Sequence, residues 1–132
     1  MKEDLGKLLL RLGIGFLMLF HGADKVLHGT TFIEGVLGAQ GLPAFIVYGV
    51  YIGEIVAPIM IILGWQTRIA GAILAFNMLT AIVLVHAKDI FSLGGHGAWS
   101  IEVPMLYLIG GIVIALIGSG RYSLEGRREN GF

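Results

Sequence analysis

The chain has 132 residues, of which 56% are hydrophobic and only 14% are charged, and its mean hydropathy is +0.85. Charged residues make up about a quarter of an average soluble domain, so this composition excludes an ordinary soluble fold and indicates one domain built for a lipid bilayer. The formal net charge is zero and cysteine is absent. A basic nucleic-acid-binding surface, disulfides and thiolate-bound iron–sulfur clusters are therefore excluded for this chain.

Four segments are apolar enough to cross a bilayer as helices, which takes roughly 20 residues each. They cover residues 5–27, 43–63, 68–87 and 100–118. Helices are expected because lipid offers no partners to backbone groups and four segments are too few for a barrel. The sequence thus predicts an all-α, four-transmembrane-helix bundle with up-down-up-down order, a single membrane domain over residues 1–132 that ends in a tail at 119–132.

The loop after the first span has a helix signal of its own. Residues 31–34, "TFIE", match a capping box, in which a threonine and a glutamate satisfy the first amides of a helix. The helix predicted over residues 32–39 is apolar and stops before the "GLP" of residues 41–43. We expect it to lie along the outer membrane interface.

Small residues on the later spans favour close helix packing. They are Gly49 and Gly53 on the second span, Gly71 and Ala75 on the third, and Gly110 and Gly111 on the fourth.

The basic residues predict the orientation. Seven lie at the N-terminus, in the loop after the second span or at the C-terminus: Lys2, Lys7, Arg11, Arg68, Arg121, Arg127 and Arg128. Only Lys25 and Lys88 lie on the other side. Because cytoplasmic loops carry the excess of lysine and arginine, we expect a multi-pass protein of the plasma (inner) membrane with both termini in the cytoplasm.

With this orientation, every span contributes an ionisable group to the outer half of the bundle. His21 and Lys25, four residues apart, share one face at the outer end of the first span. Glu54 lies near the middle of the second span. His86 ends the third span, and Glu102 begins the fourth. Together these groups predict a polar pocket within an apolar bundle.

Glu54 is the strongest candidate for chemistry, because a charge near the centre of a membrane helix costs about 2.5–3.5 kcal/mol on insertion scales. It is either protonated or paired with Lys25, and either state allows proton exchange; the alternative is a structural ion pair that fixes helix register. Tyr51, three residues earlier, is expected on the same face. Pro58 has no N–H for the Glu54 carbonyl, which leaves a second acceptor there.

His21 is the second catalytic candidate, with a solvated histidine at headgroup level as the alternative. Two other polar residues receive structural interpretations. Arg11 is expected to reach anionic headgroups as an anchor, and Asn77 to form an interhelical hydrogen bond.

A metal or haem site is not expected. His21, His86, Glu54 and Glu102 carry suitable ligand atoms. However, the sequence contains no H-x-x-x-H or E-x-x-H spacing.

Several loose motifs follow one another along the chain. The first span contains "GFLMLFHGADKV", with Gly15, Phe16, Gly22 and Lys25. "GLP" then precedes the second span, which contains Glu54 and leaves through "LGWQTR" with Gly64, Thr67 and Arg68; the chain closes on "GSGRYSLEGR", with Ser119. In this order and spacing the chain resembles the DoxX family of small four-helix membrane proteins over nearly its whole length.

The resemblance implies a membrane protein with a possible link to quinones. The family takes its name from a membrane subunit of a thiosulfate:quinone oxidoreductase, and other members are linked to membrane redox complexes, to oxidative-stress tolerance or to cargo and receptor assembly. Together with the polar pocket, this favours a membrane oxidoreductase component that binds a quinone or a similar apolar ligand.

In this hypothesis Glu54 exchanges a proton and His21 or Lys25 hydrogen-bonds a carbonyl oxygen. Tyr51, His86 and Glu102 complete the ligand site, and the aromatic residues Phe20, Tyr48 and Tyr51 are available to flank a ring. The expected partners are membrane lipids and either further copies of the chain or a redox protein of the membrane. Two alternatives remain open: a non-enzymatic membrane scaffold or assembly factor, and an oligomeric transporter of a small solute.

Overall fold

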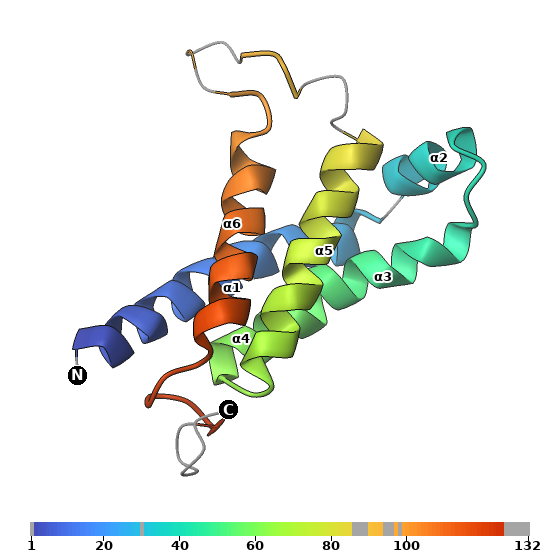
Figure 1. Cartoon of the computed structure of the whole chain (residues 1–132). Coiled ribbons are helices and arrows are strands. Elements are labelled where there is room, and N and C mark those ends of the chain that lie inside the picture. Colours follow the sequence, from blue (N-terminus) through green and yellow to red (C-terminus); the bar gives the residue numbers. More distant parts are fainter. Residues whose placement is uncertain (1, 30, 86–89, 94–96, 98, 126–132) are drawn as a thin grey trace.

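The computed structural model describes residues 2–29, 31–85, 90–93, 97 and 99–125. Its elements, in chain order, are the helices α1 (Lys2–His28) and α2 (Thr31–Ala39), the 3₁₀ turn η1 (Ala44–Ile46), α3 (Val47–Tyr51), the π-helical turn η2 (Ile52–Val56), α4 (Ala57–Leu63), α5 (Thr67–Val85) and α6 (Glu102–Ile117) (Figure 1). The described residues contain no strand, only an isolated bridge between Leu93 and Trp99. The prediction of an all-α fold is confirmed.

The helices follow the predicted spans closely. Two of them, Lys2–His28 and Thr67–Leu84, are long and apolar enough to cross a membrane, and the apolar stretches Val47–Leu63 and Glu102–Ile117 are shorter. α2 occupies the predicted loop helix and begins one residue earlier, at Thr31. Within the described residues, the hydropathy pattern therefore located each helix to within a few residues.

α1 packs antiparallel to the continuous rod formed by α3, η2 and α4, and glycines make this contact close. A Cβ atom added to Gly15 would lie 3.1 Å from the carbonyl oxygen of Pro58, and one added to Gly22 would collide with the carbonyl oxygen of Glu54. The two backbones can approach this closely only because neither glycine has a side chain.

α5 and α6 form the most extensive helix pair and also meet through glycines. A Cβ atom on Gly71 would lie 2.8 Å from both the Gly111 oxygen and the Ala115 nitrogen, and one on Gly111 would lie 2.9 Å from the Ala75 nitrogen. The expected close packing is confirmed at Gly53, Gly71, Gly110 and Gly111, but not at Gly49, where no atom lies within 4 Å of an added Cβ atom. The helix pairs enclose a core of Met18, Ala57, Ile61, Ala70, Leu74, Met78, Tyr107 and Ile114.

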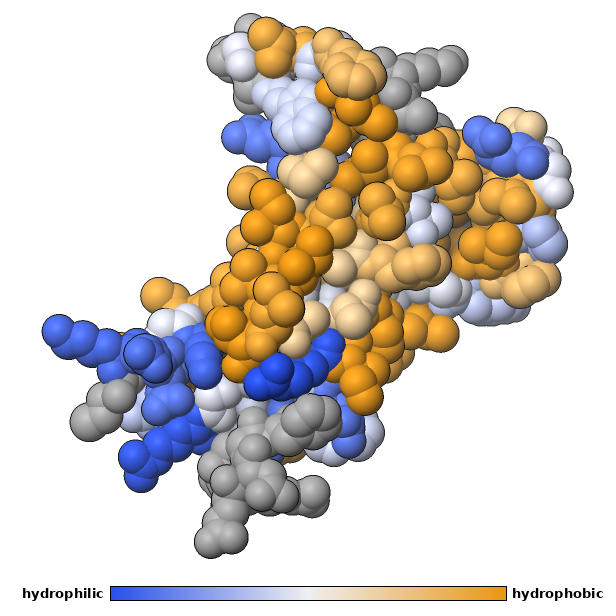
Figure 2. Space-filling view, viewed as in Figure 1, coloured by the Kyte–Doolittle hydropathy of each residue, from blue (hydrophilic) through white to orange (hydrophobic). Residues whose placement is uncertain are grey.

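The surface between the two ends of the molecule is strongly apolar. Figure 2 shows hydrophobic residues over the middle of the visible face and hydrophilic residues gathered toward the ends. Large exposed side chains on the helices include Leu17, Phe20, Ile59, Ile69, Phe76, Val83, Leu106, Ile109 and Leu116. Soluble monomers rarely expose an apolar surface of this extent, whereas lipid covers it without cost.

Arg11 is not the headgroup anchor predicted from its position, because its side chain is only 1% exposed. Its guanidinium donates to the carbonyl oxygens of Ile61 and Ile62 in the last turn of α4, at 3.0 and 3.3 Å. It also donates to the carbonyl oxygens of Ser119 and Tyr122 after α6, at 2.6 and 2.9 Å. Carbonyls in the last turn of a helix lack the usual amide donors, although Ile61 also accepts the N–H of Gly64 at 3.2 Å. The arginine fork supplies several donors at once.

The segment after α6 completes this cluster, which we call the Arg11 junction and define as Arg11, the end of α4, the start of α5 and residues 119–125. Leu124 and Glu125 donate their backbone N–H groups to the carbonyls of Leu63 and Gly64, at 3.0 and 3.1 Å. The Glu125 carboxylate accepts the N–H of Thr67 at 3.2 Å, where an acid is favoured at a helix N-terminus. The predicted tail is therefore part of the packed fold as far as Glu125; residues 126–132 lie outside the described residues.

Candidate ligand-binding pocket

A cavity of about 360 Å³ lies at the other end of the helices from the Arg11 junction. Side chains from α1, α2, η1, α3, η2, α5 and α6 line it, and most of them are apolar. Its principal polar members are His21, Lys25, Glu54, Asn77, Thr80 and Tyr107. We call this cavity the Glu54 pocket. Mostly apolar walls with a few polar groups are typical of sites for small ligands.

Lys25 and Glu54 form an ion pair on the pocket wall, with the lysine Nζ 2.6 Å from the glutamate Oε1. The side chains are 20% and 7% exposed, respectively. Of the two states considered for Glu54, the structure has the one paired with Lys25. The pair joins α1 to η2, so it both fixes two helices and presents charge to the cavity.

The backbone at Glu54 is widened into a π-helical turn. The N–H of Ala57 donates to the carbonyl of Ile52, five residues back, and Pro58 has no N–H to continue the usual ladder. Gly22 of α1 packs directly over the Glu54 carbonyl. Pro58 lies just after this turn and removes the amide that the Glu54 carbonyl would accept in an ordinary α-helix. Such turns occur frequently at functional sites.

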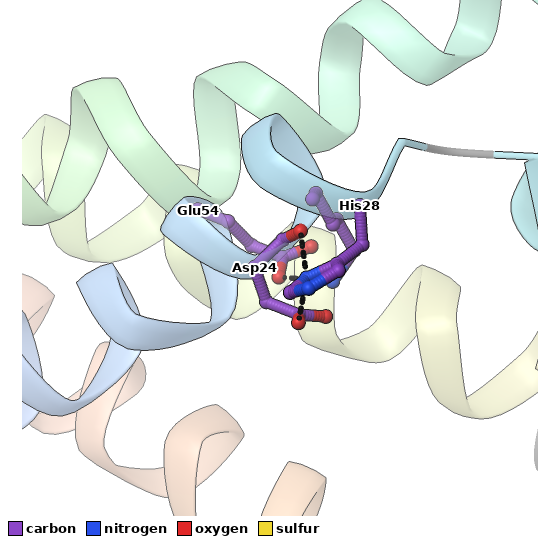
Figure 3. A network of polar contacts seen from close by, with 4 residues as sticks. Asp24, His28 and Glu54 are labelled. Atoms are coloured by element: carbon purple, nitrogen blue, oxygen red, sulfur yellow. Dashed lines mark hydrogen bonds and ion pairs between the residues drawn. The ribbon is translucent and has the colours of Figure 1, made fainter.

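Polar side chains of residues 21–28 form two further contacts at the end of α1. The His21 ring meets the Tyr107 ring edge-on, with centroids 5.6 Å apart and an interplanar angle of 85°. Asp24 and His28 point toward each other, with the Asp24 Oδ1 2.8 Å from the His28 Nδ1 (Figure 3). The latter pair is well exposed, so it contributes little to stability. His21 and Asp24 both line the pocket, so its wall includes the end of α1.

Several predicted site residues are not brought to the pocket. Tyr51 is half-buried on α3 and Glu102 is exposed at the start of α6, and neither lines the cavity. The predicted shared face of Tyr51 and Glu54 assumed the spacing of an ordinary α-helix, whereas a π-helical turn begins directly after Tyr51. Phe20 and Tyr48, at 73% and 66% exposed, face outward. His86 lies outside the described residues.

Three polar residues of α5 and α6 line the pocket although sequence reasoning did not assign them to it: Asn77, Thr80 and Tyr107. Asn77 was predicted to bond another helix, but the described part of the chain offers its amide no hydrogen-bond partner. Gly53 makes room for it, since a Cβ atom there would lie 2.5 Å from the Asn77 Cγ. In the sequence, these residues were indicated only by being polar side chains inside otherwise apolar helices.

Within the same described ranges, no three His, Asp or Glu side chains are grouped as metal ligands.

Comparison of the chain with known proteins identifies its family. The family model described as DoxX matches residues 6–87, which cover all of α1 to α5 except the first turn of α1. The chain belongs to the DoxX family. The matched region holds Arg11, Gly22, Lys25 and Glu54, and it ends before Tyr107.

Curated relatives match this DoxX protein over most of their length. It is 31% identical over 122 residues to a Bacillus subtilis protein named "Putative oxidoreductase CatD", covering 92% of this chain and 86% of the relative. An uncharacterised Haemophilus influenzae protein is 31% identical over 118 residues, covering 89% and 87%. The "Uncharacterized membrane protein Rv3486" of Mycobacterium tuberculosis is 30% identical over 127 residues, covering 89% and 78%. No solved structure matches the chain significantly.

Proposed function

We propose that this DoxX protein is a component of a membrane redox system and binds a quinone-like apolar ligand in the Glu54 pocket. The observation that carries the proposal is the Lys25–Glu54 ion pair, buried on the wall of an otherwise mostly apolar cavity. The volume of about 360 Å³ lies within the range of about 300–1,000 Å³ typical of small-molecule sites. The oxidoreductase name of the Bacillus subtilis relative supports the redox part of the proposal.

The membrane placement belongs to the same proposal. The four rods α1, α3–η2–α4, α5 and α6 cross the plasma membrane in alternating directions, with the basic termini in the cytoplasm. The Glu54 pocket then opens in the outer half of the bilayer, and α2 lies along the outer interface. In this position α2 covers the cavity with Ile33, Val36 and Leu37 and limits the access of water to the ion pair.

The residues of the pocket suit proton exchange with a ligand oxygen. A bound quinone supplies the electron-accepting group and takes up protons at its carbonyl oxygens when it is reduced. The Lys25 ammonium donates one N–H to Glu54, and its two other N–H groups can donate to a carbonyl oxygen of the ligand. Glu54 is the residue that gives or takes the proton, and His21, which is exposed and lines the pocket, relays it to water. The electrons come from a bound cofactor or a partner redox protein, since a chain without cysteine has no thiol relay or thiolate-bound cluster.

The proposal predicts that Glu54→Gln releases the ligand. The substitution removes the proposed proton donor and the counter-charge that holds Lys25 in place, so we expect ligand binding to weaken by more than tenfold, about 1.4 kcal/mol. Native mass spectrometry and analysis of the extracted lipids, on gently solubilised wild-type protein and variants, measure what is retained. We expect a quinone-sized molecule on the wild type and none on a folded Glu54→Gln variant.

Glu102→Gln is the matched control, because Glu102 is exposed and does not line the pocket. It should retain the ligand as the wild type does. A wild-type protein that carries no small ligand but holds a protein partner would contradict the proposal and support the scaffold alternative. Uptake of a solute by vesicles that contain only this protein would support the transporter alternative.

A further inference from the structure

The walls of the Glu54 pocket formed by α5 and α6 carry polar groups that the ion pair does not use. Asn77, Thr80 and Tyr107 all line the cavity. The Thr80 hydroxyl donates to the carbonyl of Phe76 in its own helix, at 2.9 Å, so its hydrogen is already engaged. The Asn77 amide and the Tyr107 hydroxyl have no hydrogen-bond partner among residues 2–29, 31–85, 90–93, 97 and 99–125.

Tyr107 is a buried residue, only 8% exposed, and its ring is held by the edge-on contact with His21. Asn77 is placed by Gly53, next to Glu54. Both residues are therefore fixed by packing, while their donor groups border the cavity. Neither polar group is among the fully buried atoms that lack a partner, so both are accessible from the cavity. A tyrosine hydroxyl or an amide in a mostly apolar pocket is stabilised by a hydrogen bond, and an occupant of the pocket can supply it.

We propose that Tyr107 and Asn77 hydrogen-bond a second acceptor of the ligand, distinct from the one bound by Lys25. The pocket then selects a flat ring with two oxygen acceptors, a cyclic dione, over a molecule with a single carbonyl. This inference rests on the proposed function, because it assigns the second end of the same ligand. Tyr107 and Asn77 act as specificity-determining residues.

The test compares two probes with similar fused rings, 2,3-dimethyl-1,4-naphthoquinone with two carbonyls and 1-tetralone with one. Their affinities are measured by equilibrium dialysis against the full chain in detergent and against the Tyr107→Phe and Asn77→Leu variants. Because one hydrogen bond contributes modestly, each substitution should weaken binding of the dione by roughly 3- to 10-fold. Binding of 1-tetralone should fall by a smaller factor, so the ratio of the affinity for the dione to the affinity for 1-tetralone should decrease.

One control matches the tyrosine variant in chemistry. Tyr48→Phe removes a phenol from an outward-facing residue that does not line the pocket. It should bind the dione as the wild type does. Equal effects of Tyr107→Phe on both probes, or no effect on either, would overturn this inference and leave the proposed function standing. A wild-type protein that binds neither probe would instead overturn the proposed function.

Discussion

Replacing Arg11 with leucine should destabilise this DoxX protein strongly, although the change makes the first span more apolar. The side chain is buried and donates to carbonyls of Ile61, Ile62, Ser119 and Tyr122, which join α1 to the end of α4 and to the segment after α6. Hydrogen bonds to charged groups contribute about 1.5–3 kcal/mol each and are not additive. We expect the free energy of unfolding to fall by at least about 3 kcal/mol, measured by titration with SDS in mixed micelles.

Arg121→Leu is the matched control, because Arg121 also lies at the Arg11 junction but its side chain is exposed. It should change the free energy of unfolding by no more than about 0.5 kcal/mol. Arg11→Lys should lose much of the stability too, since an ammonium group cannot serve both sets of carbonyls as the planar fork does. An Arg11→Leu protein as stable as the wild type would support the headgroup-anchor role and contradict the junction.

Gly22→Ala should disturb both the fold and the pocket. The added methyl group would collide with the Glu54 carbonyl and lie 2.6 Å from the Ile55 side chain, so η2 must move away from α1. Overpacking of this kind costs about 1–3 kcal/mol. Because Lys25 lies on α1 and Glu54 on η2, the same movement lengthens their ion pair. We expect lower stability in the SDS titration and loss of the retained ligand in native mass spectrometry.

Gly13→Ala gives the comparison on the same helix. Nothing lies within 4 Å of a Cβ atom at Gly13, so alanine should keep the stability or raise it by up to about 1 kcal/mol, through its better helix propensity. It should also leave ligand retention unchanged. If the two alanine variants behaved alike, the close contact of Gly22 with Glu54 would not be a constraint on the molecule.

Local patterns accounted for much of the candidate site. The spacing of His21 and Lys25 in one helix placed both of them on the pocket, and the rarity of a carboxylate in an apolar span indicated Glu54. Tyr51 does not line the pocket, and its assignment to the face of Glu54 assumed an unbroken α-helix, whereas a π-helical turn begins directly after it. Pro58 had already indicated an irregular ladder there, but one proline does not specify a π-helical turn.

The contacts of Arg11 and Tyr107 could not be predicted from the sequence. An arginine near the end of a membrane helix is usually interpreted as an anchor, and a tyrosine in an apolar helix as an interfacial or core residue. Their roles depend on groups that are remote in the chain: Arg11 bonds residues 50 to 111 positions away, and Tyr107 meets His21 from another helix. Contacts of this kind carry no periodicity that a single sequence could reveal.

The sequence by itself determined that this is an all-helical membrane protein of the DoxX family, where its helices run, and that Glu54 is the unusual charge within them. Hydropathy and helix-breaking residues act locally, so a single chain displays them in full. Only the tertiary structure decided that Lys25 is the partner of Glu54 and that the buried Arg11 side chain donates to backbone carbonyls. It also decided that Asn77 of α5 and Tyr107 of α6 line the pocket. Those outcomes depend on which helix faces meet, and glycines at the contacts, together with the π-helical turn, set that geometry.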